Sequence, residues 1–334
     1  MSATAALFDG WRRVRGAPLL LAGVWCATLA LALPPALIMR ELIADHLGES
    51  LVAENVATGV DFDWWNEFLA QAGGLGQTFG TSVIGFAAVV RNLSGVADAR
   101  FLPLPLMLVV AGHLLLSLFL LGGVLDRLAR DRATTSHGFF GACGIFFFRF
   151  LRLGLIAAVL YALLFGSFRP WLFDDLYPAW TREVTEERRA FAIYAGLSLV
   201  FGAALLLVNL ILDYAKIRMV VEDRRSAIGA ISASLRFIRR QPGPAFALYL
   251  LNALVFLAVV AIYYLAAPGA TRGWSMAVAA LVVGQVYIVL RLVVRLLFAA
   301  SQIALFQSRL AHAGYTARPV ERWPDSAVAE RLID

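Results

Sequence analysis

Four charged residues border the apolar stretches of this sequence and could form ion pairs: Asp126, Asp213, Arg291 and Arg295. Each aspartate stands at the end of an apolar run, and the two arginines are four residues apart, which places them on one face of a helix. Charged groups at membrane depth usually pair with one another or reach toward the headgroups. We therefore expect the four residues to form a network that locks the last apolar helix against the helices of the aspartates. The alternative is four independent charges at the membrane interface.

A second group of candidates consists of polar residues inside the apolar runs: His113, Asn209, Asn252 and Gln285. Polar side chains in such positions commonly join membrane helices by hydrogen bonds, and this is the interpretation that we favour. The alternative is a path for a substrate or a proton that passes His113.

Arginines between the apolar runs form a third group: Arg149, Arg152, Arg236 and Arg239. Around the last two, four apolar residues recur at helical spacing within 226–240, while the arginines take other faces. This pattern predicts a short amphipathic helix at the membrane surface, with its apolar side in the acyl boundary and its arginines among anionic headgroups. The helix is interpreted either as a topology anchor or as a specific site for lipid headgroups.

The sequence lacks the common catalytic motifs: there is no phosphate-binding Walker loop, no His-Glu-x-x-His and no Gly-x-Ser-x-Gly. The four histidines are scattered along the chain, and Cys26 and Cys143 fall in segments that cannot meet in the topology given below. We therefore expect no cofactor, no metal, no disulfide and no enzymatic activity.

The composition requires apolar surface to be buried in lipid. Hydrophobic residues make up 60% of the chain, charged residues 16%, and the mean hydropathy is +0.75. Soluble domains are close to half apolar and a quarter charged. The net charge of +6 is sorted into particular connecting segments, which indicates contact with a membrane surface and not with nucleic acid.

Six apolar runs predict six transmembrane helices, over residues 17–39, 102–125, 153–168, 190–212, 245–267 and 274–312. The fold class is therefore an all-α, polytopic bundle over residues 1–314, followed by a flexible cytoplasmic tail over 315–334. A cleavable signal peptide is the rival interpretation of the first run. Residues 40–101 form an outer loop with interfacial helices, and the apolar run in this loop could also re-enter the membrane.

The basic residues determine the predicted orientation. The N-terminus, the tail and the two connectors with the arginine clusters, here called elbows, hold most of the basic residues, whereas the outer loop is acidic. Arginine and lysine stay on the cytoplasmic side of bacterial inner membranes because they are costly to translocate. We expect both termini and both elbows to be cytoplasmic, where each elbow contains an amphipathic helix that contacts anionic lipids. Protein partners are not predicted.

The two elbows share a pattern at an offset of 87 residues. Val124-Leu125-Asp126 aligns with Ile211-Leu212-Asp213, and Arg149-Phe150-Leu151-Arg152 aligns with Arg236-Phe237-Ile238-Arg239. This alignment predicts a tandem repeat of one hairpin, which is an arrangement found in transporters, although duplication also produces plain scaffolds.

The second elbow carries a resemblance. Its segments Asp213-Tyr214-Ala215-Lys216 and Glu222-Asp223-Arg224-Arg225-Ser226-Ala227, with the pattern Phe237-x-x-Arg240-x-Pro242, resemble uncharacterised bacterial six-helix integral membrane proteins. They are distantly similar to the membrane region of some bacterial glycerophosphodiester phosphodiesterases. The resemblance implies a six-helix membrane domain, and no catalytic residue carries over.

Three functions are compatible with these features. The leading expectation is a non-enzymatic inner-membrane protein that acts as a scaffold or handles lipids or another membrane component. The first alternative is a transporter of small solutes or lipids, with a path between the second, fourth and fifth helices. The second alternative is a membrane-embedded enzyme.

Overall fold

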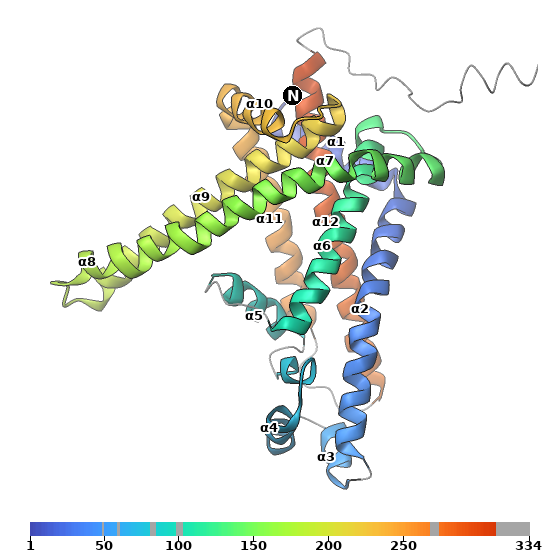
Figure 1. The fold of residues 1–334 in the computed structure, drawn as a ribbon, viewed down its shortest axis with the longest axis vertical. Coiled ribbons are helices and arrows are strands. Elements are labelled where there is room, and N and C mark those ends of the chain that lie inside the picture. Colours follow the sequence, from blue (N-terminus) through green and yellow to red (C-terminus); the bar gives the residue numbers. More distant parts are fainter. Residues whose placement is uncertain (49, 59–60, 81–84, 98–102, 268–273, 312–334) are drawn as a thin grey trace, which may run out of the picture. The chain divides into compact units, whose positions relative to one another are not determined.

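The computed structural model describes residues 1–48, 50–58, 61–80, 85–97, 103–267 and 274–311, and these residues form helices without any strand (Figure 1). Six of the described helices are long and apolar enough to cross a membrane: Pro18–Leu47, Leu104–Arg130, Ser136–Thr181, Glu187–Val221, Pro242–Ala266 and Trp274–Leu310. The all-helical class and the six apolar helices are therefore confirmed. The predicted tail 315–334 and parts of the outer loop 40–101 lie outside the described residues.

The apolar helices bury little of their surface within the protein itself. In the most apolar window of each of the six helices, at most 22% of the residues are buried. Leu199, Leu250 and Leu281 expose between 62% and 75% of their surface. A helix that is apolar on all faces needs an apolar environment around it, so this exposure is what a lipid-embedded protein requires.

The chain divides into two compact units. The first unit contains residues 1–16, 118–251 and the segment from Phe298 onward, and the second unit contains residues 17–117 and 252–297. Three long helices contribute to both units: α6 (Leu104–Arg130), α11 (Pro242–Ala266) and α12 (Trp274–Ala311). Each unit is described below by itself.

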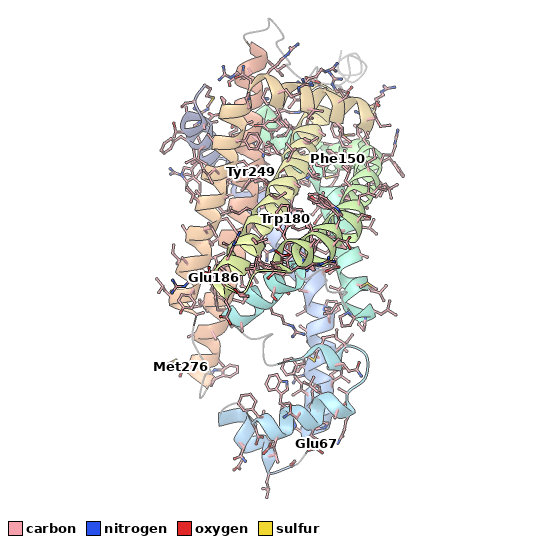
Figure 2. The ribbon with its side chains drawn as sticks, turned by 90° about the vertical axis from the view of Figure 1, so that its left-hand side faces the viewer. Glu67, Phe150, Trp180, Glu186, Tyr249 and Met276 are labelled. Atoms are coloured by element: carbon pink, nitrogen blue, oxygen red, sulfur yellow. The ribbon has the colours of Figure 1, made fainter. Side chains whose placement is uncertain are left out.

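A long helical hairpin makes up much of the first unit (Figure 1). Helix α7 (Ser136–Leu163) continues through π-helical segments at Leu164–Phe168 and Trp171–Leu176 into the short α8 (Tyr177–Thr181). Helix α9 (Glu187–Val221) then returns alongside α7. In Figure 2, Trp180 and Glu186 mark the end of this hairpin where the chain reverses.

The continuous helical span Ser136–Thr181, which consists of α7, the two π-helical segments and α8, is longer at both ends than the predicted helix over 153–168. The first elbow holds no separate short helix, because Thr135 caps a continuous helix by accepting a hydrogen bond from the Gly138 amide. Beyond residue 168, the segment up to Thr181 is helical although it contains Pro170 and Pro178. In an α-helix, proline clashes with the carbonyl group one turn earlier. The helical segments on both sides of Pro170 are wider π-helical turns, which is how the helix continues past this residue.

Two adjacent glycines allow α6 to pack closely against α7. A Cβ atom on Gly122 would lie 2.8 Å from the Ala142 carbonyl oxygen, and one on Gly123 would lie 2.6 Å from the Phe139 ring. Helix α6 ends directly before Asp131, which has a φ angle of 51°. Asp tolerates this left-handed conformation better than most residues, so the chain can turn sharply into α7.

The N-terminal helix α1 (Ala3–Arg15) docks onto the ends of two other helices of the first unit. Arg13 donates hydrogen bonds to the Leu128 carbonyl on α6 (2.9 Å) and to Gln307 Oε1 on α12 (2.8 Å). A Cβ atom on Gly10 would lie only 2.6 Å from the backbone nitrogen of Ser301. The N-terminus, the α6–α7 turn and the end of α12 therefore lie together.

Helix α10 (Ala227–Arg240) packs on α9 and precedes α11. It is the short helix predicted for the second elbow, and Ser226 is its N-cap, with Oγ accepting a hydrogen bond from the Gly229 amide. The core of the first unit includes Phe150 on α7, which is 1% exposed (Figure 2). Tyr249 on α11 is half-buried, and its ring contacts that of Phe298.

The second unit is built on α2 (Pro18–Leu47), together with α3 (Val52–Thr58), α4 (Phe62–Gln71), a 3-10 turn at Gly76–Thr78 and α5 (Phe86–Ala97). Trp64, Trp65 and Phe68 of α4 form a buried aromatic cluster against the end of α2, and Figure 2 shows Glu67 on the same helix. Trp64 Nε1 donates a hydrogen bond to His46 Nδ1 of α2 at 3.1 Å. The predicted outer loop is thus largely helical where it is described.

The tandem repeat at an offset of 87 residues is not confirmed. Both α6 and α9 end near an aspartate with positive φ, but Asp131 and Asp223 are 92 residues apart. The N-caps that follow, Thr135 and Ser226, are 91 residues apart. The spacing between the two turns is therefore longer than the offset of 87 residues found in the sequence, by about one helical turn.

Candidate functional site

The turn between α9 and α10 is held to α7 by an ion pair. Arg149 of α7 donates a hydrogen bond from Nη1 to Asp223 Oδ1 at 2.6 Å. Asp223 has a φ angle of 50°, which Asp adopts more readily than most residues because its short polar side chain can bond locally. The pair fixes the start of α10 relative to α7, although both residues come from segments 74 positions apart in the sequence.

The inner face of α10 is packed on aromatic residues from two other helices. Phe237 contacts the ring of Tyr214 on α9 and the ring of Phe306 on α12, with ring centres 4.9 Å and 5.3 Å apart. The guanidinium of Arg218 lies 4.9 Å from the centre of the Phe306 ring and pairs with Glu222 at 3.2 Å. These contacts make α10 a fixed part of the first unit.

The outer face of α10 combines apolar and basic side chains. Ile228 is 74% exposed and Leu235 is 41% exposed. Arg236, Arg239 and Arg240 are also exposed. Apolar side chains beside arginines on an exposed helix face are typical of helices that lie at a membrane surface, so this face is the surface on which a headgroup interaction can be tested.

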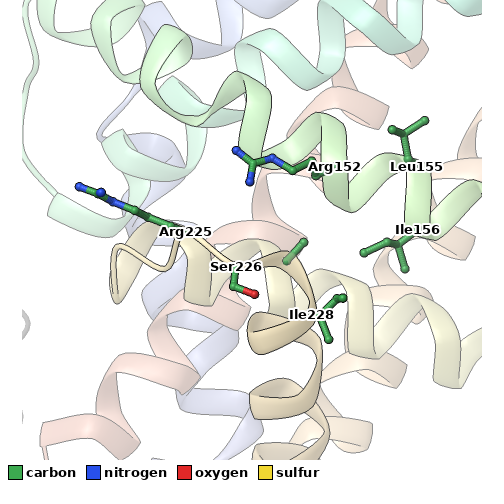
Figure 3. Close-up of a pocket in the computed structure, with 7 residues that line it drawn as sticks. Arg152, Leu155, Ile156, Arg225, Ser226 and Ile228 are labelled. Atoms are coloured by element: carbon green, nitrogen blue, oxygen red, sulfur yellow. The ribbon is translucent and has the colours of Figure 1, made fainter.

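A groove lies between α7 and the start of α10 (Figure 3). We call it the basic groove; its volume is about 560 Å³, and it is lined by Arg152, Leu155, Ile156, Arg225, Ser226, Ala227 and Ile228. Figure 3 shows the arginines toward one end and Leu155 with Ile156 at the other. Arg152 was singled out from the sequence. Arg225 and Ser226 were not candidates for this role, because only the packing of α10 against α7 brings them to Arg152.

The electrostatics of the basic groove are positive. Arg152 donates from Nε to the Phe148 carbonyl at 3.3 Å, which leaves its terminal nitrogens available. Within the part of the chain that the structure describes, neither Arg152 nor Arg225 has a carboxylate partner. The neighbouring Arg149 pairs with Asp223, and Arg224 pairs with Glu222, which Arg218 shares. The two groove arginines thus differ from their neighbours in lacking a counter-charge.

The two aspartates of the predicted ion-pair network have partners within their own helices. Asp126 pairs with Arg130 at 2.9 Å and Asp213 pairs with Lys216 at 2.9 Å. Both aspartates belong to the first unit, whereas Arg291 and Arg295 belong to the part of α12 in the second unit, where both are exposed. The four-residue network stays a prediction.

Two of the predicted polar residues bond to partners on other helices. Asn209 Oδ1 accepts a hydrogen bond from Tyr161 of α7 at 2.6 Å, and Gln285 Oε1 accepts one from Trp25 of α2 at 3.2 Å. These bonds join helices, as expected for polar residues in membrane segments. The donors Tyr161 and Trp25 were not predicted from the sequence, because a tyrosine or tryptophan in an apolar run gives no sign of its hydrogen-bond partner.

The other two polar candidates lie in the second unit. His113 Nε2 and Ser117 Oγ, one turn apart on α6, are 3.4 Å apart and hydrogen-bonded. Asn252 on α11 is fully buried. Because Asn209 belongs to the first unit, a path between the second, fourth and fifth helices stays a prediction.

Within the described ranges, no group of three or more histidine, cysteine or carboxylate side chains is arranged to hold a metal ion. Cys26 and Cys143 are both free thiols. The groove offers cationic donors at one end and apolar walls at the other.

The fold and the groove define the class of the protein: over the described residues it is all-helical, with six helices able to cross a membrane and an arginine-lined groove in its first unit. Comparisons with protein-family models, curated proteins and solved structures find no match to this chain.

Proposed function

We propose that this chain is a non-enzymatic bacterial inner-membrane protein, a scaffold that binds anionic lipid headgroups through α10 on its cytoplasmic side. Both termini are cytoplasmic in this proposal. The resemblance to six-helix bacterial membrane proteins supports the same class.

The sidedness is supported by charge and by packing. The arginine-rich segments that positive charge would keep in the cytoplasm are the N-terminus, the elbows and the end of α12. Arg13 of α1 bonds to the ends of α6 and α12, and Phe237 of α10 contacts Phe306 of α12. All these segments therefore meet at one end of the first unit, as a common cytoplasmic face requires.

The single observation that carries the proposal is the outer face of α10. The helix is fixed by Phe237 and by the ion pair at its start, yet it presents Ile228 and Leu235 together with Arg236, Arg239 and Arg240. In water, exposed apolar residues on a rigid helix would be costly. At the membrane interface they enter the acyl boundary, and each arginine near an anionic surface contributes about 1 kcal/mol.

The interior of the first unit supports a scaffold more than a solute path. Both polar groups of Asn209 are used, Oδ1 by Tyr161 and Nδ2 by the Leu205 carbonyl at 2.9 Å. A solute that binds Asn209 would have to displace these hydrogen bonds. Attachment of one helix to another is therefore the better explanation of this polar residue.

The test is lipid binding by charge variants of α10. The purified protein and the variant R236Q/R239Q/R240Q are reconstituted into vesicles that contain phosphatidylglycerol and phosphatidylcholine, and the lipids retained after mild detergent extraction are quantified. The proposal predicts enrichment of the anionic lipid by the wild-type protein and a clear loss of enrichment in the variant.

The matched control is R182Q/R188Q/R189Q, which removes three exposed arginines at the reversal between α8 and α9, at the far end of the α7–α9 hairpin from α10. This variant has the same change in net charge and should keep the enrichment. Equal loss in both variants would show that only total charge matters, and unchanged enrichment in the α10 variant would contradict the proposal.

A further inference from the structure

We propose that the basic groove holds one anionic phospholipid as a discrete site, with its phosphate between Arg152 and Arg225 and the upper part of one acyl chain along Leu155, Ile156 and Ile228. This inference rests on the proposed function and specifies one site within it. It differs from binding along α10 as a whole, because it assigns a ligand, a stoichiometry and two further residues, Arg225 and Ser226.

The charge of the groove selects a phosphate. Arg152 and Arg225 are exposed and, over the described ranges, have no carboxylate partner, so their charges are not neutralised by the protein. Guanidinium groups present planar sets of donors that match phosphate oxygens. Ser226 Oγ accepts a hydrogen bond from Gly229 and still has its hydroxyl proton to donate. Every polar side chain of the lining is therefore able to donate to an anion.

The walls of the groove select a chain next to that phosphate. Leu155 is 62% exposed and Ile228 is 74% exposed, and Leu155 with Ile156 forms the end of the groove away from the arginines (Figure 3). A soluble phosphate compound would leave these side chains in contact with water. A phospholipid suits both ends of the groove. Its phosphate would lie at the arginine end, and the acyl chain attached to it would lie along Leu155 and Ile156.

The size of the groove limits how much of the lipid it takes. A volume of about 560 Å³ lies within the range of ordinary ligand pockets, roughly 300–1,000 Å³. This space suits a headgroup with the start of one chain, while the remainder of the lipid stays in the bilayer. A headgroup with net negative charge is favoured over a zwitterionic one, because the lining offers two cations and no carboxylate for an ammonium group.

The experiment counts tightly bound lipids on the intact full-length protein. Wild-type protein in detergent is titrated with phosphatidylglycerol or phosphatidylcholine, and native mass spectrometry resolves each bound lipid. We expect one phosphatidylglycerol molecule to bind more tightly than all later ones. The variant R152Q/R225Q should weaken this first binding step by about tenfold or more, because charged hydrogen bonds are lost. Both side chains are exposed, so thermal unfolding should be nearly unchanged.

Two further variants make the result specific. I228N should weaken the first step for the lipid without altering the charge of the groove. R236Q/R239Q should reduce the later, weaker steps and leave the first step intact. Inorganic phosphate is added as a competitor and should displace the lipid only weakly.

Each opposing outcome overturns a defined part of the account. If R152Q/R225Q leaves the first binding step unchanged, the discrete site is refuted, while loss of later steps in R236Q/R239Q would still support the proposed function. If inorganic phosphate displaces the lipid completely at low concentration, or I228N has no effect, the groove binds phosphate and not a phospholipid. If neither arginine pair affects any step, both the site and the proposed function fail.

Discussion

Replacing Gly10 by alanine should destabilise the protein, although the same change usually stabilises a helix. Gly10 lies in the middle of α1, where alanine is favoured over glycine by about 1 kcal/mol in helix propensity. The new Cβ atom, however, would lie 2.6 Å from the backbone nitrogen, 2.7 Å from Cα and 2.8 Å from Cβ of Ser301. The first two atoms are backbone atoms of α12 and cannot rotate away, so the two helices would have to separate.

The expected magnitude follows from these opposing effects. Overpacking costs typically 1–3 kcal/mol, and α1 would also lose part of the bonding of Arg13 to Leu128 and Gln307 if it moved. After the gain in propensity is subtracted, we expect a net loss of about 1–2 kcal/mol. For a chain of this size, this corresponds to a decrease of several degrees in the unfolding temperature.

The assay is thermal unfolding of the detergent-solubilised protein, with Gly144→Ala as the matched control. Gly144 is an exposed glycine inside α7, and a Cβ atom there would meet nothing within 4 Å. The control should therefore raise the unfolding temperature or leave it unchanged. If Gly10→Ala has the same effect as Gly144→Ala, α1 is not docked on α12, and the packing argument for a common cytoplasmic face is refuted.

Two further substitutions test single hydrogen bonds. Tyr161→Phe removes the donor to Asn209 and should cost about 0.5–1.5 kcal/mol, measured as a lower unfolding temperature; an unchanged temperature would show that this bond does not join α7 to α9. Trp64→Phe keeps an aromatic ring but removes the donor to His46, so the aromatic cluster should lose near-ultraviolet circular dichroism and about 1 kcal/mol of stability. The matched control is Trp180→Phe, an exposed tryptophan that should have little effect on stability.

The sequence predicts the presence of six long apolar helices, because the lengths of most apolar runs match the thickness of a membrane, although the third helix is much longer than predicted. It also predicts the helix at the second elbow, for which Ser226 provides the N-cap in the structure. These features depend on local composition and local hydrogen bonds. The location of α10 at a membrane interface and the orientation of the chain remain predictions, because they depend on lipid as well as on the protein.

Long-range packing explains what the sequence could not predict. The docking of α1 depends on Gly10 meeting Ser301, and a glycine in a short helix carries no sign of a partner so distant in the chain. The basic groove has the same origin, since Arg152 and Arg225 become neighbours through the pair of Arg149 with Asp223. The continuation of α7 through Pro170 was missed because π-helical turns have no signal in the apolar pattern.

The repeat predicted from the sequence is not confirmed by the helices of the structure. The match at an offset of 87 residues aligns part of α7 with α10. In the structure, α7 is continuous, whereas α10 ends at Arg240 and α11 begins at Pro242. Proline is favoured in the first turn of a helix and disfavoured inside one, so Pro242 and Pro244 separate the second elbow helix from the helix that follows, and the first elbow has no such break.

The most direct test of the central claim is the sidedness of α10. Single cysteines are introduced at Ser232, which is exposed on α10, and at Thr185, which is exposed before α9, after Cys26 and Cys143 are replaced by alanine. Intact bacterial cells with a permeabilised outer membrane are treated with a membrane-impermeant maleimide. The account predicts labelling at Thr185→Cys in intact cells and labelling at Ser232→Cys only after the inner membrane is disrupted. Labelling of Ser232→Cys in intact cells would place α10 outside and contradict the account.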